Sequence, residues 1–125
     1  MVKSICSMLC VLVIIVVGAL CESTFVIKQF EEFESASESL YQKTEEQTAV
    51  KDDAVALQEN WLNKKKYLHN FIPHTEIKEM DLWLSEAITL IDQKAWDDAL
   101  PKIKVINDLA KRIPDTFRVS IENIL

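Results

Sequence analysis

The sequence predicts an all-α protein in which an N-terminal transmembrane helix precedes an antiparallel bundle of three to four helices. Three observations predict helices beyond the first 21 residues. The only glycine is Gly18, and strand-like alternation of apolar and polar residues is absent, so β-hairpins with glycine turns are not expected. Helix-forming Glu, Lys, Leu, Ala and Gln dominate instead.

Residues 1–21 are predicted to be a transmembrane signal anchor. The run ICSMLCVLVIIVVGALC, Ile5 to Cys21, has no charged residue. At the helical rise it spans about 25 Å, just under the roughly 30 Å hydrocarbon core of a bilayer. Lys3 precedes this run and acidic residues follow it. We therefore expect a single-pass protein of the cell membrane, with its N-terminus in the cytoplasm and its C-terminal domain outside.

Two other interpretations of this segment remain open. Val17, Gly18 and Ala19 are small residues of the kind that a signal peptidase requires, so cleavage after Ala19 is one alternative. Lipid modification of Cys21 is the other, although Leu20 beside the cysteine and Gly18 before it make a poor lipobox. The unbroken apolar run and the minimal basic region before it favour a retained anchor.

Charge and cysteine content limit the classes of function. All three cysteines, Cys6, Cys10 and Cys21, lie in the apolar segment, so the rest of the chain must fold without disulfides. Residues 22–125 carry all 20 acidic and 13 of the 14 basic residues, a net charge of −7. That balance argues against nucleic acid as a partner. The predicted partners are the lipid bilayer, through the N-terminal helix, and another membrane or envelope protein.

Residues 22–125 are predicted to form an extracytoplasmic helical domain in two parts. In residues 22–49 a loose apolar stripe of Phe25, Phe30, Phe33 and Leu40 gives way to mostly polar sequence, which indicates a stalk-like, weakly packed first helix. Residues 50–125 are predicted to form the packed bundle. The expected core anchors are aromatic: Trp61, Trp83, Trp96, Phe71 and Phe117.

Apolar residues at three- and four-residue intervals define the helices of this bundle. One helix runs from Val50 until Pro73 ends it, and the next begins near Thr75 and has its inner face over residues 77–91. A fourth helix follows the turn DQKAWDDALPK. Because proline is tolerated in a first turn, Asp97 or Asp98 is expected to cap this helix; a start before Trp96 would make Pro101 a kink. Pro114-Asp115 predicts the cap of a last short helix.

The stretch YLHNFIPHTEIKEMD contains both histidines and is either a binding site or a helix joint. The alternative function is a metal- or small-ligand-binding sensor that uses His69, His74, Glu76 and Glu79. However, Pro73 separates the histidines, and the His-Glu-x-x-His and Glu-x-x-His patterns are missing. The joint accounts for more residues: Pro73 closes one helix, His74 or Thr75 caps the next, and the two glutamates lie near its N-terminus, where negative charge is favourable.

Catalysis is not expected from this sequence. No glycine-framed turn presents a serine or cysteine nucleophile, and phosphate-binding and EF-hand loops also require glycines that residues 22–125 lack. The paired acidic residues are typical of solvated helix faces. We therefore expect a non-catalytic interaction module, without cofactor, catalytic residues or metal ligands.

The chain also resembles a known family in Trp61, the stretch FIPHTEI and the terminal SIENIL. The family comprises short proteins of Gram-positive bacteria that are classed only as a domain of unknown function, and the matching positions are Trp61, His74, Trp96 and Asn123. The resemblance implies a bacterial membrane setting and a multi-pass membrane partner encoded nearby. It implies no activity, because none is established for the family.

Overall fold

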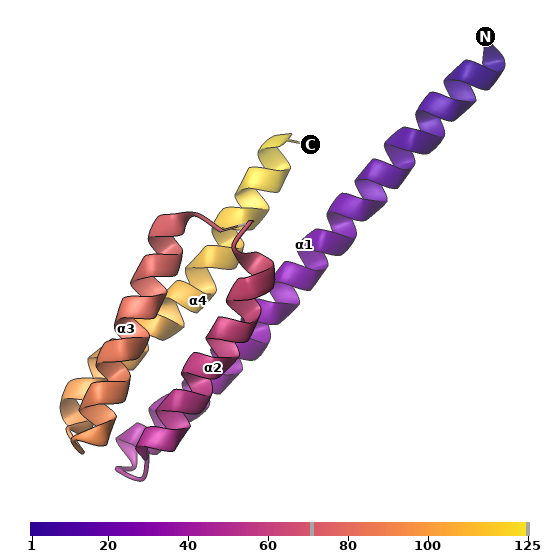
Figure 1. Ribbon diagram of the computed structural model, residues 1–125. Helices are drawn as coiled ribbons and strands as arrows, with labels where there is room; N and C mark the ends of the chain where they lie inside the picture. Colours follow the sequence, from indigo (N-terminus) through magenta and orange to yellow (C-terminus); the bar gives the residue numbers. More distant parts are fainter. Residues whose placement is uncertain (71, 125) are drawn as a thin grey trace.

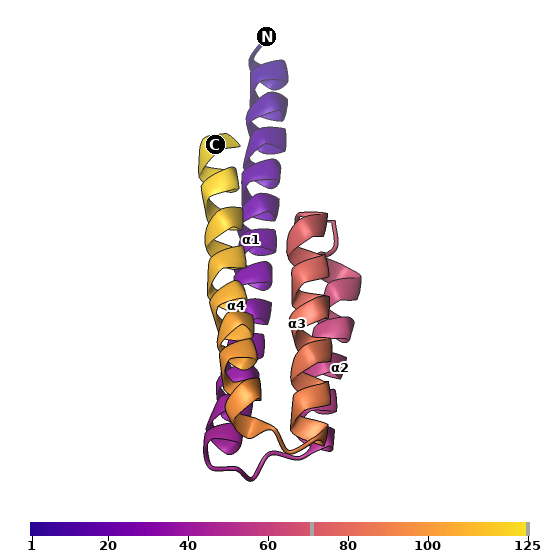
Figure 2. The same ribbon diagram turned by 90° about the vertical axis from the view of Figure 1, so that its left-hand side faces the viewer.

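The computed structural model describes residues 1–70 and 72–124, and side chains as far as residue 115. Within these ranges the chain forms four helices: α1 (Val2–Glu45), α2 (Lys51–Leu68), α3 (His74–Asp92) and α4 (Trp96–Ile124) (Figure 1). The helices run alternately up and down, and α4 packs against both α3 and α1, which closes the bundle (Figure 2). The predicted all-α fold, with a long apolar N-terminal helix followed by a helical bundle, is confirmed.

Helix α1 is one continuous helix of 44 residues. Its first half projects from the bundle, whereas its second half forms one wall of it (Figure 1). The stalk-like, weakly packed helix expected over residues 22–49 does not match the structure, because one face of this stretch is buried. The buried residues of α1 are Val26, Phe30, Phe33, Ser37, Leu40 and Thr44.

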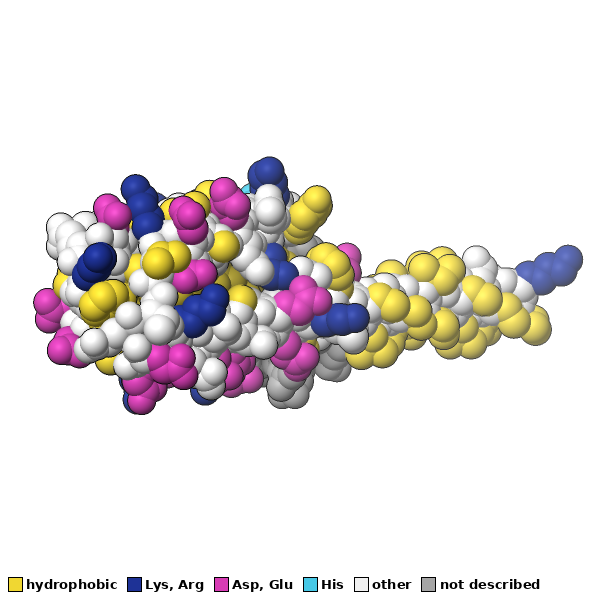
Figure 3. All heavy atoms as spheres, turned by 90° about the horizontal axis from the view of Figure 1, so that it is seen from below, with side chains coloured by type: hydrophobic (Ala, Val, Ile, Leu, Met, Phe, Trp, Pro, Cys, Tyr) yellow, Lys and Arg dark blue, Asp and Glu magenta, His cyan; other side chains and the backbone are white. Residues whose placement is uncertain are grey.

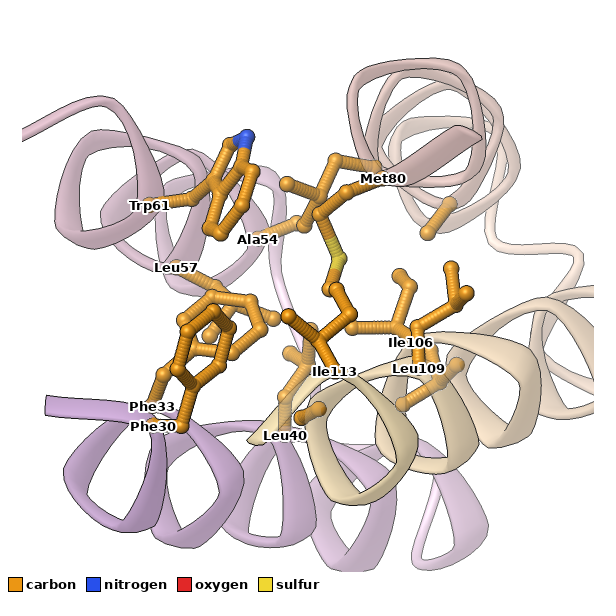
Figure 4. Packing of buried hydrophobic residues seen from close by; sticks show 14 of the residues in the cluster. Phe30, Phe33, Leu40, Ala54, Leu57, Trp61, Met80, Ile106, Leu109 and Ile113 are labelled. Atoms are coloured by element: carbon orange, nitrogen blue, oxygen red, sulfur yellow. The ribbon is translucent and has the colours of Figure 1, made fainter. Parts of the chain in front are cut away.

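The core begins with an aromatic cluster between α1 and α2. Trp61 is fully buried, and its ring centroid lies 6.3 Å from that of Phe30 and 5.6 Å from that of Phe33. Met80 from α3 and Ile106 from α4 continue the core beyond this cluster (Figure 4). Trp61 is therefore the core anchor that its spacing predicted.

The other predicted aromatic anchors are less central. Trp83 and Trp96 are half-buried and pack against the core from its edge. The Trp96 indole N–H also donates a hydrogen bond of 3.1 Å to the main-chain oxygen of Ala49, which ties the start of α4 to the α1–α2 turn. Phe71, and the side chain of Phe117, lie outside the described part of the chain.

Helices α1 and α3 each end in the same type of turn, and neither turn contains glycine. Gln47 (φ 61°) and Lys94 (φ 58°) occupy the left-handed conformation just after the C-caps of these helices. In α1 the amide of Thr48 donates to the carbonyl of Lys43 at 2.8 Å, and that of Gln47 donates to Thr44 at 3.1 Å, which is the Schellman pattern. The chain thus forms a glycine-type turn with residues that bear a Cβ.

Two predicted helix caps differ from the structure. Pro73, not His74 or Thr75, is the N-cap residue of α3, and no side chain caps that helix. Helix α4 begins at Trp96, so Asp97 and Asp98 lie in its first turn rather than at its cap. Negative charge in a first turn still favours the helix through its dipole.

The expected break at Pro114 is also wrong, because α4 continues through Pro101 and Pro114 to Ile124. Each interior proline costs roughly 3 kcal/mol. Burial of the apolar face on both sides of Pro101, at Ala99, Ile103 and Ile106, offsets that cost.

Candidate functional site

The α2–α3 joint places both histidines in solvent. Helix α2 ends at Leu68, α3 begins at His74, and Ile72 between them is buried. His69 is exposed, and its Nδ1 lies 2.9 Å from the main-chain oxygen of Lys66. Because a carbonyl oxygen only accepts, Nδ1 must carry the proton of this bond. His74 is also exposed, as the first residue of α3.

The two glutamates that follow His74 bind an arginine of α4. The guanidinium of Arg112 lies 2.9 Å from Glu76 Oε2 and 3.5 Å from Glu79 Oε2. The hydrogen bond to Glu76 raises the pKa of Arg112 above its ordinary value, and the charges of Glu76 and Glu79 act in the same direction. Since more than half of the Arg112 side chain is exposed, these ion pairs link α3 to α4 with a modest contribution to stability.

The structure does not assemble the predicted sensor set. Within residues 1–70 and 72–124, as far as side chains are described, no group of three or more His, Cys, Asp or Glu side chains is placed to hold a metal ion. Glu76 and Glu79 point to α4, while the His69 ring turns back to its own helix. The arrangement is that of a helix joint.

A polar network that the sequence did not predict joins α2 to α3. The indole N–H of the buried Trp61 donates to Asp81 Oδ1 at 2.7 Å, and Lys65 Nζ donates to Asp81 Oδ2 at 2.7 Å. Trp61 and Lys65 are four residues apart and therefore share a face of α2. That spacing was the only available signal, and it does not identify Asp81 as the partner.

The three consecutive lysines of α2 point in different directions. Lys64 donates to Gln29 Oε1 at 2.8 Å and to Glu32 Oε2 at 3.0 Å, both on α1. Lys65 binds Asp81 on α3, and Lys66 is exposed. Two of the three lysines thus hold neighbouring helices.

The projecting half of α1 is the remaining feature without a partner inside the bundle. Among the described residues, α1 is the one helix long and apolar enough to cross a membrane, and none of its most apolar stretch is buried. Figure 3 shows hydrophobic side chains along this projecting rod, while charged side chains lie among hydrophobic and other polar groups on the bundle. A membrane anchor and a signal sequence share these properties.

The fold and these contacts define a class of protein: a four-helix bundle whose first helix carries an apolar N-terminal extension. Residues 23–124 match the family model described as "Domain of unknown function (DUF4363)", so the chain belongs to that family. The match begins just beyond the apolar segment and covers the whole bundle. Comparison with curated proteins and with solved structures finds no match.

Proposed function

We propose that this protein is a membrane-tethered, non-catalytic interaction module whose helical bundle lies outside the cell. One observation carries the proposal: α1 passes without a break from an uncovered apolar rod into the wall of the bundle. A helix that is apolar on all sides and uncovered by protein is stable in lipid. The first buried residue of α1 is Val26, five residues after Cys21, so no stalk separates the span from the bundle.

The flanking charges support the proposed orientation. Lys3 and the terminal amine precede the apolar run, and Glu22 follows it directly. Positive charge is retained on the cytoplasmic side during insertion, which supports a bundle outside the cell. The exposed apolar rod alone also fits a cleaved signal sequence. The mass of the mature protein distinguishes a retained anchor from a cleaved signal sequence.

Two exposed leucines mark a candidate contact surface for a protein partner. Leu62 on α2 and Leu82 on α3 are 43% and 55% exposed. Each directly follows one partner of the Trp61–Asp81 hydrogen bond, so both lie at the same height on adjoining helices. Exposed leucines on two neighbouring helices are suited to contact with the helix of another membrane or envelope protein.

The test combines recovery of the protein with crosslinking in intact membranes. We expect the full-length mass in a membrane fraction that alkaline carbonate does not extract. A photo-crosslinking residue at position 62 or 82 is expected to give an adduct with a second protein, and the matched control at exposed Glu46 is not. A mass lacking the apolar segment would refute the tether. A retained protein with no adduct at either leucine position would refute the contact surface.

A further inference from the structure

The contacts between α1 and α2 fix the height of the α2–α3 joint above the apolar rod. Lys64 binds Gln29 and Glu32, and α2 runs antiparallel to α1, so the residues after Lys64 approach the end of the rod at Cys21. Gln29 lies about 12 Å beyond Cys21 at the helical rise. His69, five residues after Lys64, therefore lies only about 5–9 Å beyond Cys21. The headgroup layer of a bilayer has about this thickness.

Charge is distributed unevenly between the two ends of the bundle. We define the rod end as residues 22–33, 61–83 and 111–124, and the loop end as residues 34–60 and 84–110. The rod end has eight acidic and eight basic residues, whereas the loop end has twelve acidic and five basic residues. The whole net charge of −7 thus lies at the end away from the rod. An anionic surface repels the loop end and leaves the rod end free to approach.

A groove on α2 extends from Glu59, at the border of the loop end, to His69 at the rod end. It is a shallow, open depression of about 570 Å³ that is lined by one helix. Of its two lysines, Lys65 is bound to Asp81. Lys66 is exposed and no ion pair is formed by it within the described part of the chain. The lining residues are Glu59, Leu62, Asn63, Lys65, Lys66 and His69.

Two exposed aromatic residues of the rod end lie near the height of the membrane surface. Phe25 of α1 is 48% exposed and Tyr67 of α2 is 68% exposed. At the helical rise they lie about 6 Å and about 9 Å beyond Cys21. Tyrosine is enriched at this depth, where its ring contacts apolar chains and its hydroxyl contacts water, and Phe25 adds an apolar ring near the same level. The rod end therefore combines a free cation with aromatic residues at a single level.

We propose that the rod end of the bundle docks on the headgroup layer of the bilayer and that the α2 groove takes the headgroup of an anionic phospholipid. Lys66 supplies the positive charge to the phosphate, while Glu59, the carboxylate of the groove, lies seven residues earlier on α2 and therefore about 10 Å further from the bilayer. Phe25 and Tyr67 enter the interface beside it. This inference rests on the proposed membrane tether, because the height of the groove is measured from the rod.

The experiment measures how close two positions of the full chain lie to lipid headgroups. Cys6, Cys10 and Cys21 are replaced by serine, and a fluorophore is attached through Asn70→Cys or, as the matched control, through Thr48→Cys. The protein is reconstituted into phosphatidylcholine vesicles with or without phosphatidylglycerol, and headgroup-nitroxide lipids are used as short-range quenchers. Position 48 lies about 35 Å further from the rod than position 70, so only position 70 is expected to be quenched.

The groove itself is tested by Lys66→Ala, with Lys94→Ala at the loop end as a control of equal charge change. Removing one lysine near an anionic surface lowers the ratio of bundles docked on the bilayer to bundles held away from it about fivefold. We expect that loss for Lys66→Ala in phosphatidylglycerol vesicles only, and none for Lys94→Ala. Equal effects of the two variants, or displacement of the bundle by millimolar inorganic phosphate, would overturn the lipid assignment. Vesicle-bound protein with an unquenched position 70 would overturn docking alone, whereas protein that washes off the vesicles would overturn the tether as well.

Discussion

Replacement of Asp81 by alanine is expected to destabilise the bundle through an indole group that it leaves without a partner. Trp61 is fully buried, and its N–H donates to Asp81 at 2.7 Å. A buried donor without an acceptor costs about 1–3 kcal/mol. The Lys65–Asp81 ion pair, about one-third exposed on both sides, adds less than about 1 kcal/mol. We therefore expect a loss of about 2 kcal/mol, which lowers the melting temperature of a domain of this size by roughly 10 °C.

The assay is thermal unfolding of the full chain in detergent micelles, followed by circular dichroism. Asp81→Asn is the matched control, because its amide oxygen still accepts from Trp61 while the ion pair is lost. The cost of Asp81→Asn is expected to be below about 1 kcal/mol. In a Trp61→Phe background no indole N–H exists, so Asp81→Ala should cost only what the ion pair contributes. An equal loss from Asp81→Ala with and without the indole at position 61 would refute this reasoning.

Three further predictions use the same melting or denaturant assays. Phe33→Ala is expected to cost about 3–5 kcal/mol because Phe33 is fully buried, whereas exposed Phe25→Ala should change stability by less than about 0.5 kcal/mol; similar losses would contradict the packing of α1. Gln47→Gly is expected to stabilise the protein by roughly 0.5 kcal/mol, because glycine adopts the positive φ without the Cβ penalty, and a loss of stability would refute this. The hydrogen bond from the Val50 amide, aided by Lys43, lowers the pKa of Asp53. The ionised Asp53 therefore stabilises the fold above about pH 4, and this stabilisation is lost as the pH falls through the folded-state pKa. Asp53→Asn should flatten the acid side of the stability profile, and unchanged acid sensitivity would contradict the prediction.

The second and third helices were predictable because their signals are local. Apolar residues recur at helical spacing from Ala54 to Leu68 and from Ile77 to Ile91, and Pro73 disfavours helical geometry between them. The packing of α1 was missed for a different reason. Its buried face continues through Ser37 and Thr44, which a hydrophobic pattern counts as polar. Thr44 satisfies its hydroxyl by donating to the Leu40 carbonyl at 2.8 Å, so its burial carries little penalty.

The errors at the end of the chain and at the joint depend on tertiary contacts. Proline predicts a helix boundary from local geometry, but α4 continues through Pro101, where burial of its apolar face on both sides offsets the local cost, and on through Pro114. The contacts of Asp81 with Trp61 and of Arg112 with Glu76 depend on the vertical register between neighbouring helices. That register is fixed by the joint and the core together. It has no signature within a single helical segment.

The unbroken α1 has a mechanical consequence in a bilayer. Cys21 and Glu45 are separated by about 36 Å along the helix axis, and no hinge interrupts the helix between them. Transmembrane helices tilt by about 20° on average, and the angle adjusts to bilayer thickness. A tilt of that size swings the turn at residues 46–50 sideways by roughly 12 Å. In the proposed tethered state, a change in bilayer thickness would therefore displace the outermost turns of the bundle sideways.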